Sequence, residues 1–219
     1  MILLRRQPAP DALIAKQAEW TRRFLELPPA ADTDWATRSA KKLLREHLTP
    51  MSHNKCVYCE SILNKTVKSQ VEHYYSKWRY RDRVFEWTNL FLACAMCNEA
   101  KQDLDHGGML LKPDEDDGEL FFWLDRWTGR LEALSRADSE RALQTIGLCN
   151  LNRVTLCAER RRLYEKVQRH WEAIRNGTLP PNLHRDFTGL LRPGTEHKFA
   201  IRFALPEDLK ERDRELFHG

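Results

Sequence analysis

The sequence predicts an α+β protein that is mainly helical, with a small ββα core between N-terminal helices and a C-terminal helical region that carries a β-hairpin. Three observations support this fold class. Apolar residues recur at helical spacing in both end regions. Two short segments typical of strands, residues 69–73 and 89–93, lie between two C-x-x-C pairs, at 56–59 and 94–97. A Gly-containing turn at residues 128–129 separates two further strand-like segments.

We divide the 219 residues into three regions. Residues 1–50 are predicted to form a helical docking region, residues 51–112 to hold the ββα core with its cysteines, and residues 113–219 to contain the hairpin and the C-terminal helices. A chain of this length can bury a hydrophobic core without disulfides. Its composition, with 42% hydrophobic and 31% charged residues, is typical of a folded protein and disfavours both disorder and a membrane class.

Two helices are predicted in the N-terminal region. The first spans residues 11–27, where apolar side chains follow a helical period. The second spans residues 34–48, with Asp32 or Thr33 as its N-cap and Pro50 as the residue that ends it. Together the two helices are expected to form a hairpin that docks on a partner.

The central region is predicted to run strand, loop, strand, helix. The strands are residues 69–73 and 89–93, and the helix starts after Cys97 with Asn98 near its N-terminus. Residues 103–118 are rich in Asp and Gly, which indicates a loop after this helix.

The C-terminal region begins with a hairpin made of residues 120–124 and 131–134. Apolar periodicity and helix-ending glycines then indicate a series of helices. These are predicted at about residues 139–147, 153–175, 199–203 and 207–217.

The hydropathy of the chain and its first six residues indicate the cellular compartment of the protein. The mean hydropathy is −0.65, and no apolar run approaches the roughly 20 residues that cross a bilayer. In residues 1–6 the apolar part is too short for a signal peptide, and the charges lie on its wrong side. We therefore expect a cytoplasmic protein without a membrane-bound part, in which thiols stay reduced.

Charge is distributed unevenly along the chain, although the net charge is only +4. Basic residues gather at positions 38–45 and 153–169, and acidic residues gather at positions 103–119. Basic groups of this kind suit a polyanion such as nucleic acid, and they are equally typical of solvated helix faces. The sequence leaves both interpretations open.

The two C-x-x-C pairs have the spacing of a structural zinc site closed by four thiolates. A redox motif needs only one such pair, so the second pair favours zinc over a redox site or unrelated buried thiols. Cys149 and Cys157 do not match this spacing and are expected to be buried thiols. The four predicted zinc ligands are Cys56, Cys59, Cys94 and Cys97.

Other polar residues accompany the cysteines. Glu72-His73 follows the first pair, Asn89 precedes the second, and Asn98 and Lys101 follow Cys97. This combination resembles the HNH endonuclease superfamily, also called ββα-metal or His-Me finger nucleases, in its four-cysteine branch. The resemblance covers about a fifth of the chain and implies metal-dependent hydrolysis of nucleic-acid phosphodiester bonds.

The resemblance implies a role for each of these residues. His73 is expected to be the general base, because an unperturbed histidine pKa of about 6.5 suits proton abstraction at neutral pH. Glu72 and Asn98 are expected to supply oxygen ligands for a catalytic Mg²⁺ or Mn²⁺, and His73 is expected to belong to the same cofactor site. Asn89 is expected to brace the loop that carries the histidine, and Lys101 to contact a neighbouring phosphate.

Simpler roles remain open for the same residues: a structural His73, a surface carboxylate at Glu72, and a helix N-cap at Asn98. In a regular strand Glu72 and His73 face opposite sides, so Glu72 is structural unless the strand ends or bends there. Two positions also depart from the family pattern. Asn98 stands where a histidine is common, and Gln102 stands where a glycine is common.

A basic and aromatic loop at residues 78–83 lies between the two predicted strands. Its arginines, Arg79, Arg81 and Arg83, are candidates for gripping phosphates while the aromatic side chains stack on bases. A solvated arm with one buried aromatic ring explains the same composition.

Three flanking segments, residues 5–10, 110–114 and 145–153, are similar to the HNH nuclease subunit of Septu-type anti-phage defence, which is also found beside some retrons. This resemblance implies an ABC-type ATPase as partner and foreign nucleic acid as substrate, with DNA favoured over RNA. The alternatives are a zinc-ribbon module that binds nucleic acid without cleaving it, or a structural adaptor that recruits a partner.

Overall fold

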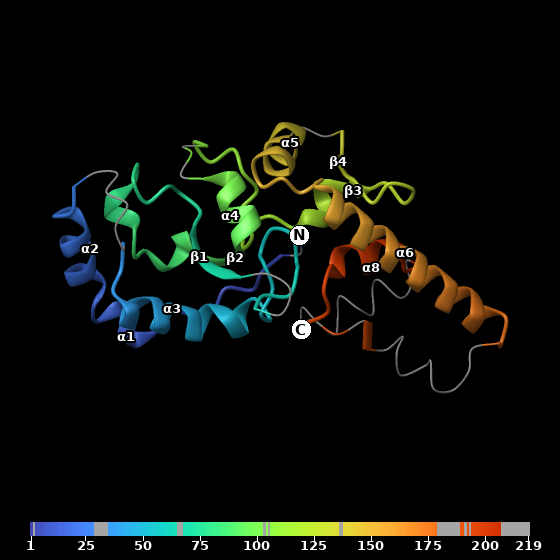
Figure 1. Ribbon diagram of the computed structural model, residues 1–219, viewed down its shortest axis with the longest axis horizontal. Coiled ribbons are helices and arrows are strands. Elements are labelled where there is room, and N and C mark those ends of the chain that lie inside the picture. The colour runs from blue at the N-terminus through green and yellow to red at the C-terminus, as the bar shows by residue number, and fades with distance from the viewer. Residues whose placement is uncertain are drawn as a thin grey trace.

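A β-hairpin between two helices forms the centre of the fold (Figure 1). In this computed structural model, strand β1 (Ser69–His73) pairs antiparallel with strand β2 (Leu90–Cys94), and Val71 lies opposite Leu92. Helix α4 (Ala95–Lys101) follows β2 directly and contacts both strands. Helix α3 (Arg38–Met51) also contacts both strands. Every residue of β2 is buried, which explains why its sequence is continuously apolar rather than alternating.

The structure describes most of the chain. The described residues are 1, 3–28, 35–64, 68–102, 104, 106–135, 138–178, 189–190, 192 and 194–206. Within them, helices predominate and the strands form two separate two-stranded sheets, which confirms the predicted mainly helical α+β class. The helix predicted at residues 207–217 lies outside the described residues.

The first predicted helix is divided in two. Helix α1 (Asp11–Ile14) and helix α2 (Gln17–Leu25) are separated by a turn in which the Lys16 amide bonds to the Leu13 carbonyl rather than continuing the α-helical pattern. The break reorients the chain so that Leu13 and Phe24 are both buried. The packing of these two side chains therefore overrides a periodicity that would fit one straight helix.

Helix α3 differs from its predicted limits at both ends. Its first turn is capped by Thr37, whose hydroxyl accepts a hydrogen bond from the Ala40 amide at 3.2 Å. The caps proposed from the sequence, Asp32 and Thr33, lie outside the described residues. Pro50 does not end the helix, which continues to Met51. A proline in the last turn removes a single backbone donor, and burial of Met51 holds the turn in place.

The predicted C-terminal hairpin is confirmed. Strands β3 (Phe122–Leu124) and β4 (Leu131–Ala133) pair antiparallel. Gly129, in the turn between them, has a φ of +71°, and an added Cβ there would lie 2.0 Å from the Cys157 carbonyl oxygen. This turn therefore requires glycine both for its conformation and for its close approach to the helix that contains Cys157.

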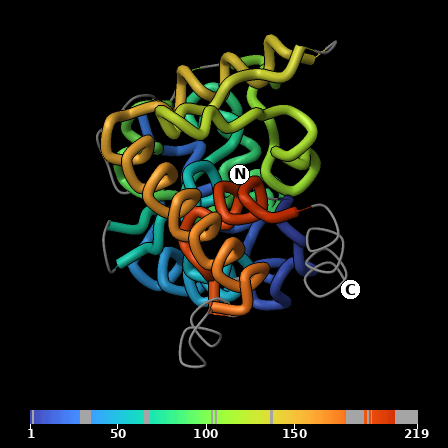
Figure 2. The backbone as a smooth tube through the Cα atoms, turned by 90° about the vertical axis from the view of Figure 1, so that its right-hand side faces the viewer, coloured from blue at the N-terminus to red at the C-terminus, as the bar shows by residue number. Residues whose placement is uncertain are grey.

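Three helices complete the described part of the C-terminal region: α5 (Ser139–Leu148), α6 (Val154–Arg175) and α8 (Lys198–Ala204). Figure 2 shows α6 running along the face of the molecule with α8 beside it. The two helices share a small apolar cluster that is separate from the main core. Short 3-10 turns at Arg81–Arg83 and Trp87–Asn89 fill the connection between β1 and β2. None of the described helices has the length and apolar character needed to span a bilayer.

Candidate functional site

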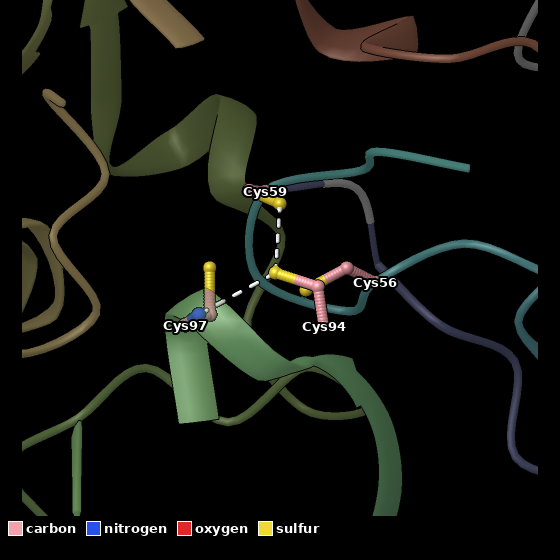
Figure 3. Close-up of side chains that lie close together, drawn as sticks. All are labelled: Cys56, Cys59, Cys94 and Cys97. Carbon is pink, nitrogen blue, oxygen red and sulfur yellow. Dashed lines mark hydrogen bonds between the residues drawn. The ribbon is translucent and has the colours of Figure 1, made fainter. Parts of the chain in front are cut away.

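The four predicted zinc ligands converge in the structure (Figure 3). Cys56 and Cys59 lie in the turn before β1, Cys94 ends β2, and Cys97 lies in the first turn of α4. Their sulfur atoms all lie within 4.8 Å of one another. Among the residues that the structure describes, no second group of three or more His, Cys, Asp or Glu side chains brings its ligand atoms together in this way.

The geometry of this cluster fits zinc. Two sulfurs bound to one tetrahedral zinc at about 2.3 Å lie about 3.8 Å apart. The Cys59 and Cys94 sulfurs are separated by 3.8 Å. All four side chains are buried, and none of the six cysteines forms a disulfide. The cysteine set is therefore suited to a closed structural zinc site, with no ligand position left over for a substrate.

Arg153 supports the same interpretation. Its guanidinium group lies 3.4 Å from the sulfur of Cys97, 3.5 Å from that of Cys59 and 3.9 Å from that of Cys94. A zinc ion bound to four thiolates carries a net charge of about −2, which a neighbouring guanidinium offsets. Arg153 precedes α6, so this contact also fastens the C-terminal helices to the cysteine cluster.

The four thiols do not ionise equally. Burial raises the pKa of the Cys56 thiol well above its usual range. Hydrogen bonding with Cys56 lowers the pKa of Cys59 well below that range and also lowers the pKa of Cys94. The thiols thus shift one another's pKa, and a divalent cation bound by the four sulfurs would displace the thiol protons.

The other two cysteines lie apart from the cluster, as the sequence predicts. Cys149 is buried, and burial raises the pKa of its thiol. Cys157 is buried on α6, with its sulfur 3.4 Å from the Asn152 carbonyl oxygen. Both behave as small apolar side chains rather than reactive thiols.

His73 is the last residue of β1 and is 4% exposed. Its Nε2 lies 3.0 Å from the Val84 carbonyl oxygen, so Nε2 carries the proton and Nδ1 keeps a lone pair. Trp35 packs against it edge to face, with the ring centres 4.5 Å apart. Burial, and then the charge of Lys77, lowers the pKa of His73 to about 3. The imidazole is therefore neutral near neutral pH.

Asn89 braces the loop between His73 and Val84. Its Oδ1 accepts a hydrogen bond from the Tyr75 amide at 2.7 Å. Its Nδ2 donates to the Tyr75 carbonyl at 3.2 Å and to the Arg83 carbonyl at 3.1 Å. One buried amide therefore closes the loop at both ends and fixes the carbonyl that holds His73.

Glu72 lies on the face of β1 opposite to His73, because the strand stays regular through both residues. Its Oε1 lies 2.9 Å from the Lys101 ammonium and accepts a hydrogen bond from the Tyr58 hydroxyl at 3.1 Å. Glu72 is 2% exposed and Lys101 is 1% exposed. The bend that would bring Glu72 to the His73 side is absent from this strand. The Lys101 ammonium is turned into the protein, away from the surface position that a phosphate contact requires.

Asn98 lies on α4 and is partly buried. Its Nδ2 donates to Gln70 Oε1 at 2.5 Å. Gln70 precedes Glu72 by two residues and shares its strand face. Asn98 is not a helix cap: the cap is Cys94, whose sulfur accepts from the Cys97 amide at 3.4 Å, so α4 starts three residues earlier than the sequence predicts.

The predicted site residues are thus divided between the two faces of the hairpin. Glu72, Asn98 and Lys101 lie on the α4 side, and His73 lies on the other side, next to Trp35. Each has fixed partners of its own. The sequence did not indicate the partners Tyr58, Gln70 and Arg153; only Gln70 had a usable signal, since it shares a strand face with Glu72.

The three arginines of the connecting loop have different surroundings. Arg81 donates to the carbonyls of Phe24 at 2.8 Å and Leu27 at 2.6 Å, so it caps the end of α2. Arg83 forms an ion pair with Glu86 at 2.5 Å, and its guanidinium lies 4.3 Å from the centre of the Tyr75 ring. Arg79 is exposed. The loop is therefore anchored to the N-terminal helices rather than extended into solvent as an arm.

Fold and site together define a ββα unit framed by a four-cysteine cluster suited to zinc. The chain is similar to the Septu protein PtuB of Bacillus thuringiensis, with 37% identity over 102 residues. The matched segment covers 46% of this chain and 37% of that protein. This similarity confirms the resemblance to Septu-type proteins that the sequence indicates. No family model matches the chain.

Proposed function

We propose that the protein is a metal-dependent HNH endonuclease and the nuclease component of a Septu-like anti-phage defence system. The observation that carries the proposal is the hydrogen bond from His73 Nε2 to the Val84 carbonyl, in a loop closed by Asn89 at the end of the β1–β2 hairpin opposite to Cys94. The similarity to PtuB supports the defence context.

The hydrogen bonding of His73 suits a general base, but its burial does not: desolvation lowers its pKa from the expected 6.5 to about 3, so proton abstraction near neutral pH requires the site to open. The hydrogen bond through Nε2 fixes the tautomer, which leaves the Nδ1 lone pair to accept a proton from a water molecule. Asn89 acts as a positioning residue, since it holds the loop that orients the ring. His73 is only 4% exposed, so the proposal requires the neighbouring Trp35 ring to shift when a substrate binds.

Asn98 and Glu72, the two predicted oxygen ligands, are not equally suited to bind a hard cation. Asn98 fits, because its bond to Gln70 uses Nδ2 and orients Oδ1, an oxygen of the kind that Mg²⁺ and Mn²⁺ prefer. Glu72 fits only after it leaves Lys101, and we propose that it serves mainly as the buried partner of that lysine. A bound Mg²⁺ or Mn²⁺ would polarise the scissile phosphate and stabilise the leaving oxygen.

The proposed partner is an ABC-type ATPase. The N-terminal helices are candidates for docking it, as the sequence suggests. Activity could depend on this partner, so it belongs in every test of function.

A cleavage assay tests the proposal. Labelled DNA and RNA are incubated with the zinc-loaded protein and Mg²⁺ or Mn²⁺, with and without the partner ATPase. His73→Ala is expected to lower the cleavage rate by about 10²- to 10⁴-fold, the range for loss of a general base. His47→Ala, which changes an exposed histidine on α3, is the matched control and should cleave normally. Equal cleavage by His73→Ala and wild type would overturn the proposal.

A second candidate function is nucleic-acid binding without cleavage. The Glu72–Lys101 ion pair favours it, because this pair neutralises the carboxylate that a nuclease of this type would use as a metal ligand. It predicts salt-dependent binding that His73→Ala leaves unchanged, and no cleavage under any condition.

A further inference from the structure

One face of helix α3 carries a row of four basic residues. They occur at positions i, i+3, i+4 and i+7, which places them on one side of a helix. The opposite side buries Ala40, Leu44 and Leu48 against the core. We call this row the α3 basic stripe; it consists of Arg38, Lys41, Lys42 and Arg45.

The α3 basic stripe lines a surface groove of about 740 Å³. Asn64, which precedes β1, and Ser69, the first residue of β1, also line the groove. Among the described residues that line it, Glu46 is the single acidic one, and its contact with Lys42 is long, at 3.7 Å, between exposed side chains. An exposed pair of this kind contributes little, so the groove keeps a strongly positive character.

The stripe lies next to His73. The Lys41 ammonium is 5.8 Å from the centre of the Trp35 ring, and that ring packs edge to face on His73 at 4.5 Å. Trp35 precedes α3 by three residues, so the N-terminal end of the stripe adjoins the candidate base. The aromatic ring at this end also offers a surface on which a base could stack.

The other basic groups of the chain face different surroundings. On and before α6, Arg153 contacts the cysteine sulfurs, and Arg160 is buried with a hydrogen bond to the Leu151 carbonyl at 2.7 Å. Arg161 and Arg162 form ion pairs with Glu165 and Glu159 on the same helix. In the connecting loop, Arg81 is bound to the carbonyls that end α2. Of the two basic groups seen in the sequence, the one on α3 is linked to His73, through the contacts of Lys41 with Trp35 and of Trp35 with His73.

We propose that the α3 basic stripe binds the phosphate backbone of a nucleic-acid strand and leads that strand to His73. The stripe extends from Arg38 to Arg45, which covers about 10 Å of helix, enough to contact about two or three phosphates. The direction toward His73 rests on the proposed nuclease function, whereas the binding itself does not.

Binding is measured with the full-length, zinc-loaded His73→Ala protein, so that no substrate is cleaved. The probes are fluorescently labelled single-stranded DNA, duplex DNA and single-stranded RNA, at several salt concentrations. Lys42→Glu/Arg45→Glu changes two exposed cations of the stripe. Arg162→Glu/Arg169→Glu is the matched control, because it makes the same change in net charge at two exposed positions of α6. Zinc content and the unfolding midpoint verify that both variants are folded.

The stripe variant is expected to bind at least 10-fold more weakly to one or more of the probes, and the slope of log affinity against log salt should fall by about 1 to 2. The control should stay within about twofold of the parent. An equal loss of affinity in both variants would show that binding depends only on net charge, and would overturn the proposal. So would unchanged binding in the stripe variant, or stripe-dependent binding of poly-glutamate without binding of any nucleic acid.

The same substitutions in the wild-type background separate this inference from the proposed nuclease. If wild type binds through the stripe and cleaves nothing, the stripe is upheld and the nuclease fails. If wild type cleaves and the stripe variant cleaves equally fast at limiting substrate, the nuclease is upheld and the stripe fails.

Discussion

Lys101 and Glu72 form a buried ion pair, with 2.9 Å between the ammonium nitrogen and the carboxylate oxygen, that joins helix α4 to strand β1. The Lys101 ammonium also donates to the His73 carbonyl at 3.0 Å, and Tyr58 donates to the carboxylate. The pair therefore fastens the helix to the strand on the side opposite to the His73 ring. Its position gives the first of four predictions.

Lys101→Met should destabilise the protein by about 3–5 kcal/mol, because removing one partner leaves a buried charge uncompensated. Glu72→Gln should be destabilising for the same reason. The double variant should be less destabilised than the sum of the two single variants. Urea unfolding of the zinc-loaded proteins measures all three, and additive losses would show that the two charges are not coupled.

Asn89→Ala should destabilise the protein by about 2–4 kcal/mol, because two carbonyls and one amide of the loop lose their buried partner. If the protein is a nuclease, cleavage should also slow, since the loop carries the Val84 carbonyl that orients His73. Asn176→Ala, at an exposed position after α6, is the control and should have no measurable effect on unfolding. A similar unfolding midpoint in both variants would contradict the bracing role.

Arg153→Ala should weaken zinc retention about 10- to 100-fold, the usual cost of removing a side chain that supports metal ligands. Arg153→Lys keeps the charge but loses the planar guanidinium that reaches three sulfurs, so an intermediate value is expected. Competition with a chelator, followed by zinc analysis, gives the measurement. Arg130→Ala, an exposed arginine in the hairpin turn, should match wild type.

Cys94→Ser should abolish stoichiometric zinc binding and unfold the central region, because Cys94 is a predicted zinc ligand and its sulfur also caps α4. Cys157→Ala should keep one zinc per chain, since that thiol lies outside the cluster. Zinc analysis and near-UV circular dichroism distinguish the two variants. Chelation or acidification of wild type should reproduce the Cys94→Ser spectrum, because the ligands bind zinc only when deprotonated. A folded, zinc-free Cys94→Ser protein would contradict the structural role.

Much of the fold was predictable because its signals are local in the sequence. Both hairpins follow from short strand-like segments. The turn between β3 and β4 requires Gly129, because its φ is positive and a side chain there would collide with the Cys157 carbonyl. The limits of the helices were less predictable. Packing of Leu13 and Phe24 divides the first helix, and burial of Met51 carries α3 past a proline.

The sequence by itself determined the cysteine cluster and the ββα order around it, because ligand spacing and strand patterns are properties of short segments. The brace at Asn89 was expected only from the resemblance to HNH endonucleases. Only the tertiary structure decided what each charged side chain faces. Glu72 meets Lys101 and Tyr58, Arg81 meets the end of α2, and Arg153 meets the sulfurs. These partners come from elements that are distant in sequence, and burial fixes each pairing because a charge removed from water requires an opposite charge or a hydrogen bond.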